Sequence, residues 1–381
     1  MRKSILAGIV GLILPIVPST AQADRVCTAE ISPGESVQGL VDSLEPSDVG
    51  CLEEGTYTED VTFDTGDGGT PDNYVTLRSA PNERATIKGR VVVTDAADFV
   101  VVQDLNLDGF DPVSEASSLT INGDNVIVSQ NDIYNGNSRI CVNVGPTGFG
   151  QAYNTTIQRN KVHNCGDLVR DEHDHGLYLE QSSDAHVIDN WIYDNADRGV
   201  QLFPDAQDAE IRYNAIDGNG EDVSFGGGNL GEGEEASSNN TVTNNLLTVA
   251  VKRWLVEESW PGLIGTGNIA SDNCLWPDHP SDPFYDQNGG ISLNPVGFVA
   301  TDNTTLSSDP YVNRAAKDFT RRSGVCPGKG PRYPVGPNTG DHREHRKHGA
   351  HGSKGSHKRH GTKRKRAKKE RHRAPGARHR H

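Results

Sequence analysis

The stretch Val187-Ile188-Asp189-Asn190-Trp191-Ile192 contains the pattern that decides the fold: apolar, two variable residues, asparagine, one variable residue, apolar. The same pattern recurs at residues 128–133, 157–162, 211–216 and 242–247. A period of 20–50 residues is typical of solenoids, in which each repeat forms one coil. The repeated asparagines, at intervals of 29, 30, 24 and 31 residues, are Asn131, Asn160, Asn190, Asn214 and Asn245.

The pattern extends in both directions along the chain. Leu105 takes the asparagine's place in residues 102–107, and we expect Gly267 to take it in residues 264–269. About seven coils are therefore predicted.

A second strand follows each asparagine after a few residues. Side chains alternate between the two faces of a strand, so Leu177 and Leu179 are expected to point inward, and Tyr178 and Glu180 outward. The predicted second strands are residues 119–122, 140–143, 177–180, 200–203 and 223–226.

These features resemble the right-handed parallel β-helix of the pectate-lyase-like superfamily, over roughly residues 27 to 326. The segments Cys51 to Glu59 and Asp309 to Phe319 match the first and last segments often seen there. The resemblance implies an all-β fold, a right-handed single-stranded parallel β-helix, in which stacked asparagines hydrogen-bond between coils. Such folds host several unrelated functions, so activity must be argued from the site.

Residues 1–23 have the layout of a cleavable secretory signal peptide. Arg2 and Lys3 precede an apolar run from Ile5 to Val17, and Ala21-Gln22-Ala23 follows. The run is too short to span a bilayer, and no second run of about 18 apolar residues occurs. We expect a secreted, extracellular protein without a membrane span, a monomer, with the β-helix domain at residues 24–328.

Six cysteines in an exported chain favour disulfide bonds over metal or redox roles. Sequential pairing is preferred among the fifteen possible connectivities, with free thiols as the alternative. The pairs predicted in this way are Cys27–Cys51, Cys141–Cys165 and Cys274–Cys326.

Charge divides the chain into an acidic body and a basic tail. Residues 341–381 hold 16 Lys and Arg against 3 acidic residues, a net charge of +13, which leaves −28 for the first 340 residues of a chain whose total is −15. Residues 329–381 contain few apolar residues and are expected to be disordered. The basic run 363–369 suits polyanions such as wall polymers, which would associate the protein with the cell envelope, and nine histidines could bind metal. A purely solubilising tail is the alternative.

The densest group of reactive side chains is residues 170–180, a loop that runs into an outward-alternating strand. Stacking of coils is expected to place Tyr178 between Cys141 and Gln201, and Glu180 between Asn143 and Phe203. Arg139 and Arg198 are expected near His175. The candidate catalytic residues are His173, His175, Tyr178, Glu180, Arg139 and Arg198.

This group suits β-elimination on a uronic-acid polymer. The reaction needs a group that neutralises the carboxylate, a base for the C5 proton and an acid for the leaving oxygen. His175 is the preferred base, Tyr178 a candidate acid, and either arginine the cation. No cofactor is certain, but a calcium ion held by Asp171, Asp174 or Glu180 could replace the arginine. The same groups without net cleavage would give C5 epimerisation.

Alginate epimerases and several lyases of the superfamily carry a His-Gly step and acidic residues on this surface, which His175-Gly176 resembles. The Arg-Ile-Lys segment of polygalacturonases is absent, so hydrolysis ranks below lyase chemistry. No P-loop, dinucleotide fingerprint or GxSxG elbow occurs. Each candidate also has a structural interpretation: His175-Gly176 as a strand start, Tyr178 as a surface residue, and Glu180 with Arg198 as an ion pair.

We therefore predict a secreted carbohydrate-active β-helix, a polysaccharide lyase or epimerase for an acidic glycan. The alternative is a non-catalytic glycan-binding or surface protein with a polyanion-binding tail. The two differ in whether the candidate side chains converge in a groove.

Overall fold

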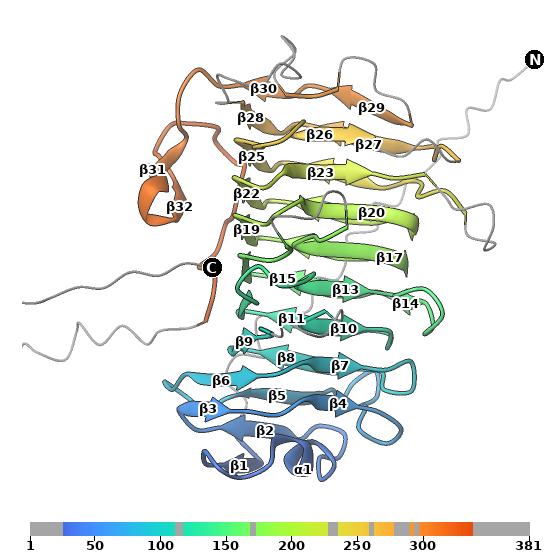
Figure 1. Cartoon of the computed structure of the whole chain (residues 1–381), viewed down its shortest axis with the longest axis vertical. Coiled ribbons are helices and arrows are strands. Elements are labelled where there is room, and N and C mark those ends of the chain that lie inside the picture. Colours follow the sequence, from blue (N-terminus) through green and yellow to red (C-terminus); the bar gives the residue numbers. More distant parts are fainter. Residues whose placement is uncertain are drawn as a thin grey trace, which may run out of the picture. The chain divides into compact units, whose positions relative to one another are not determined.

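The computed structural model describes residues 26–110, 117–167, 173–227, 235–258, 263–277, 290–292 and 297–337. In these residues the chain winds as a right-handed parallel β-helix, as predicted (Figure 1). The predicted signal peptide, Asp171 and residues 338–381 of the predicted tail lie outside the described residues. In the described part of the chain, no helix is long and apolar enough to cross a membrane.

Three parallel sheets run along the solenoid, and successive coils contribute one strand to each. The eleven-stranded sheet contains β1 (Ala29–Ile31), β2 (Val49–Leu52), β5 (Val75–Ser79), β8 (Val100–Gln103), β11 (Ile127–Ser129), β15 (Thr156–Gln158), β18 (His186–Ile188), β21 (Glu210–Arg212), β24 (Thr241–Thr243), β27 (Asn268–Ser271) and β29 (Phe298–Thr301). The ten-stranded sheet contains β3 (Gly55–Tyr57), β6 (Ala85–Lys88), β9 (Asn106–Asp108), β12 (Asp132–Tyr134), β16 (Lys161–His163), β19 (Trp191–Tyr193), β22 (Ala215–Asp217), β25 (Leu246–Thr248), β28 (Cys274–Trp276) and β30 (Thr304–Thr305).

The nine-stranded sheet carries the second strands of the repeat. It contains β4 (Val61–Phe63), β7 (Val91–Val93), β10 (Leu119–Ile121), β13 (Val142–Val144), β17 (Leu177–Ser183), β20 (Arg198–Gln207), β23 (Glu221–Phe225) and β26 (Val256–Glu258), with β14 (Ala152–Tyr153) beside β17. Because strands of the first and last segments also join the sheets, the structure has more coils than the seven predicted.

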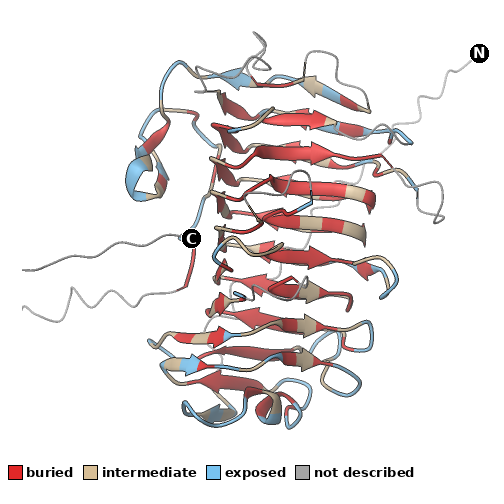
Figure 2. Ribbon diagram, viewed as in Figure 1, coloured by how far each residue is buried: buried red, intermediate tan, exposed pale blue. Residues whose placement is uncertain are grey.

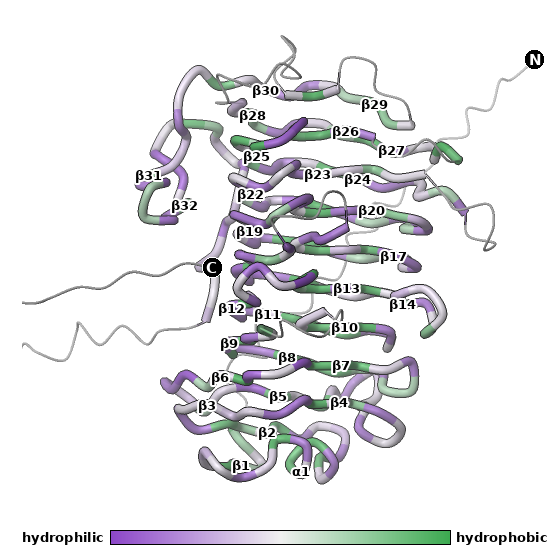
Figure 3. The backbone as a smooth tube through the Cα atoms, in the orientation of Figure 1, coloured by the Kyte–Doolittle hydropathy of each residue, from purple (hydrophilic) through white to green (hydrophobic). Residues whose placement is uncertain are grey.

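Alternation along the strands builds the core. In β17, Leu177 and Leu179 are fully buried, while Tyr178 and Glu180 are partly exposed, as predicted. Inward aliphatic side chains of successive coils stack into one continuous cluster, and burying each contributes roughly 1.5–3 kcal/mol. Figure 2 shows this burial along the sheets, and Figure 3 shows that hydrophilic residues gather in the turns.

The asparagine corner lies between the eleven-stranded and ten-stranded sheets. Each side-chain oxygen accepts hydrogen bonds from the backbone and side-chain nitrogens of the asparagine one coil before, as from Asn190 to Asn214 at 2.9 and 3.0 Å. Leu105 begins this column, since its backbone nitrogen donates to Asn131. We define the asparagine corner as Asn131, Asn160, Asn190, Asn214, Asn245, Asn273 and Asn303.

The predicted role of Gly267 is wrong. Asn245 donates to Asn273, and Asn273 donates to Asn303. The repeat therefore continues through 270–275 and 300–305, where alanine occupies the first apolar position. Alanine is small enough for the core but carries a weak apolar signal.

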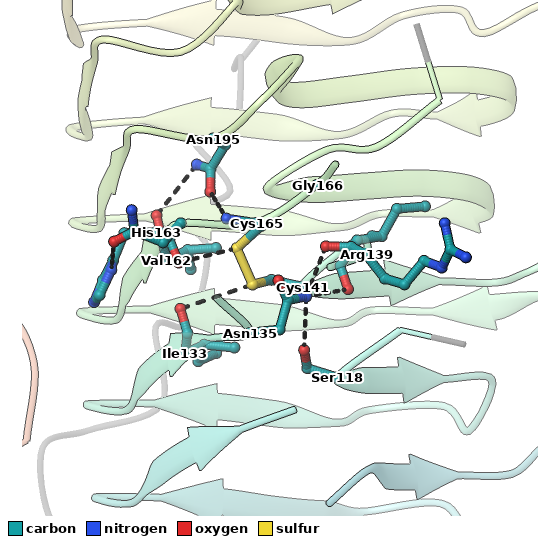
Figure 4. Close-up of a disulfide and its surroundings, with 12 residues drawn as sticks. Ser118, Ile133, Asn135, Arg139, Cys141, Val162, His163, Cys165, Gly166 and Asn195 are labelled. Carbon is teal, nitrogen blue, oxygen red and sulfur yellow. Dashed lines mark hydrogen bonds between the residues drawn. A yellow bond between two sulfur atoms is a disulfide. The ribbon is translucent and has the colours of Figure 1, made fainter. Parts of the chain in front are cut away.

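All six cysteines are paired as predicted, at Cys27–Cys51, Cys141–Cys165 and Cys274–Cys326. Figure 4 shows the second disulfide, where Asn195 accepts a hydrogen bond from the backbone nitrogen of Cys165 and donates to the carbonyl of Val162. The disulfide therefore joins the coil of Cys141 to that of Cys165, and Asn195 connects the coil of Cys165 to the next one.

Both ends of the described chain carry additional elements. Helix α1 (Val37–Val41) buries Val37, Leu40 and Val41 against the first coils, and Ser36 caps its N-terminus. Near the carboxyl end, β31 (Tyr311–Asn313) and β32 (Asp318–Arg321) form an antiparallel hairpin around a short 3-10 helix (Arg314–Ala316).

The C-terminal segment, residues 327–337, lies against the outside of the asparagine corner. Lys329 donates to Asn244, Arg332 to both carboxylate oxygens of Asp189, and the backbone nitrogen of Gly336 to the carbonyl of Arg159. The disordered tail predicted from residue 329 is therefore placed too early, because residues 329–337 pack on the solenoid.

Candidate functional site

The outward face of the nine-stranded sheet carries a ladder of polar side chains from successive coils. Parallel pairing places Tyr178 beside Asn143 on one side and Gln201 on the other. The predicted neighbour Gln201 is correct, but Cys141 is wrong, because β13 begins at Val142 and the register differs by two residues. The polar ladder, in coil order, is Thr120, Asn143, Tyr178, Gln201, Ser224 and Glu257.

Tyr178 and His175 contact each other directly. Their rings meet edge to face with centroids 4.9 Å apart. Burial raises the pKa of the Tyr178 phenol well above its usual value, and the charge of Glu180 adds to this. The phenol therefore remains protonated at neutral pH.

His175 is 3% exposed. Burial, followed by the charge of Arg198, holds its pKa well below the usual value. Its Nδ1 lies 3.4 Å from Asp197 Oδ2. The imidazole is therefore neutral at physiological pH, which is the protonation state of a general base.

Packing accounts for the glycine of the His-Gly step. A Cβ at Gly176 would lie 2.7 Å from the Asn195 amide and 2.9 Å from the Gly199 carbonyl. Gly176 is required by the close approach of two coils, independently of any chemistry at His175.

Glu180 is held beside the ladder at a register shift of β17. Its carboxylate accepts hydrogen bonds from Asn143 Nδ2 at 2.8 Å and from the backbone nitrogen of Thr147 at 2.9 Å. Glu180 thus hydrogen-bonds to Asn143, although in the register Asn143 pairs with Tyr178 and not with Glu180 as predicted, and the charge of Glu180 influences Tyr178. The Asn143 amide and the Thr147 backbone nitrogen therefore hold the Glu180 carboxylate in place beside the polar ladder.

Arg198 does not face solvent. Its side chain is 3% exposed, with Nη1 2.9 Å from Asp197 and Nε 3.2 Å from Glu221. The predicted surface pair of Arg198 with Glu180 is therefore replaced by ion pairs with Asp197 and Glu221. Buried pairs of this kind are costly to break, because a lone buried charge remains.

The charged network continues into the next coil. Arg253 lies 3.4 Å from Glu221 and 3.0 Å from Glu257. Glu221 and Glu257 have side chains that are 1% and 2% exposed, whereas that of Arg253 is 35% exposed. We define the charged network as Asp197, Arg198, Glu221, Arg253 and Glu257.

The other predicted site residues lie around this network. Arg139 is partly exposed, and its carbonyl accepts hydrogen bonds from Asn135 and Gly166 (Figure 4). His173 is exposed, and its charge contributes to the lowered pKa of His175. Asp174 is 3% exposed and accepts a hydrogen bond from the backbone nitrogen of Asp167 at 3.0 Å.

The calcium hypothesis gains no support from a cluster of ligands. Among the described residues, no three His, Cys, Asp or Glu side chains gather as a metal site. Asp171, one of the two predicted metal ligands, lies outside that part of the chain. Asp174 is described, and its carboxylate caps the backbone of the turn.

Sequence analysis missed Asp197, Glu221, Arg253 and Glu257. Glu221 was detectable, because reading two residues back from Val200 and Val223 places Arg198 opposite Glu221. Arg253 and Glu257 were harder to find, because β26 does not belong to any recognised repeat.

Comparison with known proteins agrees with this architecture. A family model described as the right-handed beta helix region matches residues 91–274. Residues 91–274 thus match this family model, and the chain has the right-handed parallel β-helix fold. A comparison with curated protein sequences found no match.

Solved structures with similar folds include the crystal structure of pectate lyase Pel9A. It is 12% identical with a TM-score of 0.53, covering 81% of this chain and 88% of that chain. An alginate lyase from Paenibacillus sp. str. FPU-7 is 14% identical with a TM-score of 0.40, covering 74% of this chain and 97% of that one. The tailspike protein of E. coli bacteriophage HK620, solved with a pentasaccharide, is 14% identical with a TM-score of 0.40. The match covers 72% of this chain and 55% of that chain.

Proposed function

We propose that the protein is carbohydrate-active and binds an acidic polysaccharide on the outward face of its nine-stranded sheet. The observation that carries this proposal is the placement of Tyr178. This partly exposed residue lies between Asn143 and Gln201 in the register of the sheet. An aromatic ring flanked by amides suits a sugar, which presents both an apolar face and hydroxyl groups.

The proposed reaction is β-elimination, or C5 epimerisation with the same groups. Neutral His175 is the proposed base for the C5 proton, and protonated Tyr178 the proposed acid for the leaving oxygen. Arg139, the more exposed of the two predicted arginines, is the better placed to meet the substrate carboxylate. Pel9A, which shares the fold, is named as a pectate lyase.

Hydrolysis fits the described carboxylates less well. Glycosidases use two carboxyl groups roughly 5 Å or more apart. The side chains of Glu221 and Glu257 are 1% and 2% exposed and both are paired with Arg253, so neither carboxyl group is presented to a sugar bond. Asp174 is held by the backbone of its own turn.

Non-catalytic glycan binding is the second candidate, and the burial of His175 favours it. At 3% exposure the imidazole is shielded from solvent, and the Tyr178 ring is one of the groups that pack against it. In this alternative Tyr178 and the amides bind sugar, and His175 supports the tyrosine ring.

We also propose that the protein is secreted and that its basic tail attaches it to a polyanionic matrix. The signal-like residues 1–23 and three disulfides fit an extracellular protein. The basic residues 341–381 would bind wall polymers or other polyanions through charge. A protein truncated after residue 337 should lose retention on a polyanionic matrix; unchanged retention would contradict this role.

The deciding experiment measures ultraviolet absorbance of unsaturated uronates with purified protein and a panel of acidic polysaccharides, with calcium present or chelated. We expect activity that His175→Ala lowers by about 100-fold or more, while His163→Ala, on the ten-stranded sheet, leaves it unchanged. Sugar binding without product, and without epimerisation by NMR of the polymer, would instead establish the binding function.

A further inference from the structure

The charged network has an exposed member and four buried ones. The side chain of Arg253 is 35% exposed, while the side chains of Asp197, Arg198, Glu221 and Glu257 are at most 3% exposed. A charged ligand that approaches the described network from solvent therefore meets Arg253 first.

One carboxyl oxygen of the network lacks a donor. Glu257 Oε1 is buried and accepts no hydrogen bond from a described residue, whereas Glu221 Oε2 lies 3.2 Å from Arg198 Nε. Buried polar atoms are rarely left without a partner, because each costs about 1–3 kcal/mol. A single proton shared between the two carboxyl groups would give the Glu257 oxygen a partner.

The electrostatics of the pair agree with a shared proton. Burial, followed by the neighbouring Glu221, raises the pKa of Glu257 to about 10, although Arg253 and Arg198 oppose the shift. Glu221 and Glu257 both contact the Arg253 guanidinium, at 3.4 and 3.0 Å. Two buried carboxylates beside one guanidinium cannot both ionise cheaply, so the pair titrates as a unit. At neutral pH the pair therefore carries one negative charge.

The proton also determines the net charge of the network. With one proton on the pair, the carboxylates of Asp197 and of the pair balance the guanidinium groups of Arg198 and Arg253. Without that proton the network would carry an excess negative charge, which would repel an anionic sugar. The net charge of −28 in the first 340 residues makes such a local offset important.

We propose that Glu221 and Glu257 share one proton, and that this pair leaves Arg253 able to bind the carboxylate of an acidic glycan. The pair is thus the device by which an acidic protein selects acidic over neutral sugars. This inference rests on the proposed glycan binding, and it assigns Arg253 as the specificity-determining residue.

The test measures binding of full-length protein to oligogalacturonate, to oligomannuronate and to a neutral xylo-oligosaccharide by calorimetry. Arg253→Gln should weaken acidic-glycan binding about tenfold or more and leave neutral-glycan binding unchanged. The matched control is Arg90→Gln, which removes an arginine with a side chain 36% exposed and paired with Asp60. Equal acidic-glycan binding by wild type and Arg253→Gln would overturn the inference while leaving the proposed function intact. Failure of the wild type to bind any glycan would overturn both.

Glu257→Gln tests the shared proton itself, because glutamine imitates the protonated acid. It should bind acidic glycans within about twofold of wild type at pH 7, and it should retain that binding above pH 10, where wild type loses it. The infrared band of protonated carboxyl groups at neutral pH should also decrease. An unchanged band in a folded variant would contradict the shared proton.

Discussion

The asparagine corner and the charged network are both buried and polar, but they are built on different principles. At the corner, one residue type repeats, and the side-chain oxygen of each asparagine from Asn131 to Asn303 accepts hydrogen bonds from the preceding coil. In the network, residue types change from coil to coil, and Glu257 keeps a buried oxygen without a donor. A residue type that repeats with complete hydrogen bonding indicates a structural role. An irregular set of buried charges is instead typical of a functional site.

The largest expected effect is on stability, at the corner. Asn214→Ala removes the acceptor of two buried donors on Asn190 and the donor to the Val187 carbonyl. We expect the free energy of unfolding to fall by about 3 kcal/mol or more, measured by urea denaturation.

Asn303→Ala is the matched control, because Asn303 ends the column and is partly exposed, so water can replace its hydrogen bonds. Equal losses in the two variants would show that the interior of the column has no special role.

The next effect concerns the pH dependence of stability in the network. The pKa of Glu257 is about 10 in the folded protein, against a usual 4.5. Its contribution to stability is therefore complete below pH 4.5 and is lost as pH rises towards 10. Between pH 6 and 8, wild type should lose about 3 kcal/mol relative to Glu257→Gln, measured by denaturation at each pH. Parallel pH profiles would show that Glu257 does not carry the proton.

The smallest effect concerns the C-terminal segment that covers the corner. Arg332 donates to Asp189 and lies 3.7 Å from the centroid of the Tyr213 ring. Arg332→Ala should lower the free energy of unfolding by about 1 kcal/mol. Arg322→Ala, whose ion pair with Asp309 spans 3.6 Å, should have no measurable effect. A melting temperature unchanged in both variants would mean that the segment lies on the corner without stabilising it.

The difference between the two regions also explains what could be predicted from sequence. The corner repeats at almost regular intervals, so Asn131 to Asn245 and their structural role were evident. Asn273 and Asn303 escaped notice because alanines replace larger apolar residues in their repeats. The disulfides followed from the order of the cysteines along the coils.

The site was less predictable, because it depends on register. His175, Tyr178 and Arg198 were correctly expected near one another, and their mutual influence on pKa reflects this. The burial of His175 and Arg198 was not foreseen, since residues on the outward face were assumed to meet solvent. Partners such as Glu257 lie 82 residues from His175 in the sequence and meet the network only through the stacking of coils.

The most direct test of the central claim compares two tyrosines on different faces. Tyr178 lies on the polar ladder of the nine-stranded sheet, and Tyr134 lies on the ten-stranded sheet, stacked on His163 with ring centroids 5.5 Å apart. Affinity for acidic oligosaccharides would be measured by calorimetry for wild type, Tyr178→Ala and Tyr134→Ala. The account predicts a loss of about tenfold or more for Tyr178→Ala alone. Wild-type affinity in Tyr178→Ala, or an equal loss in Tyr134→Ala, would contradict the assignment of the nine-stranded sheet as the functional face.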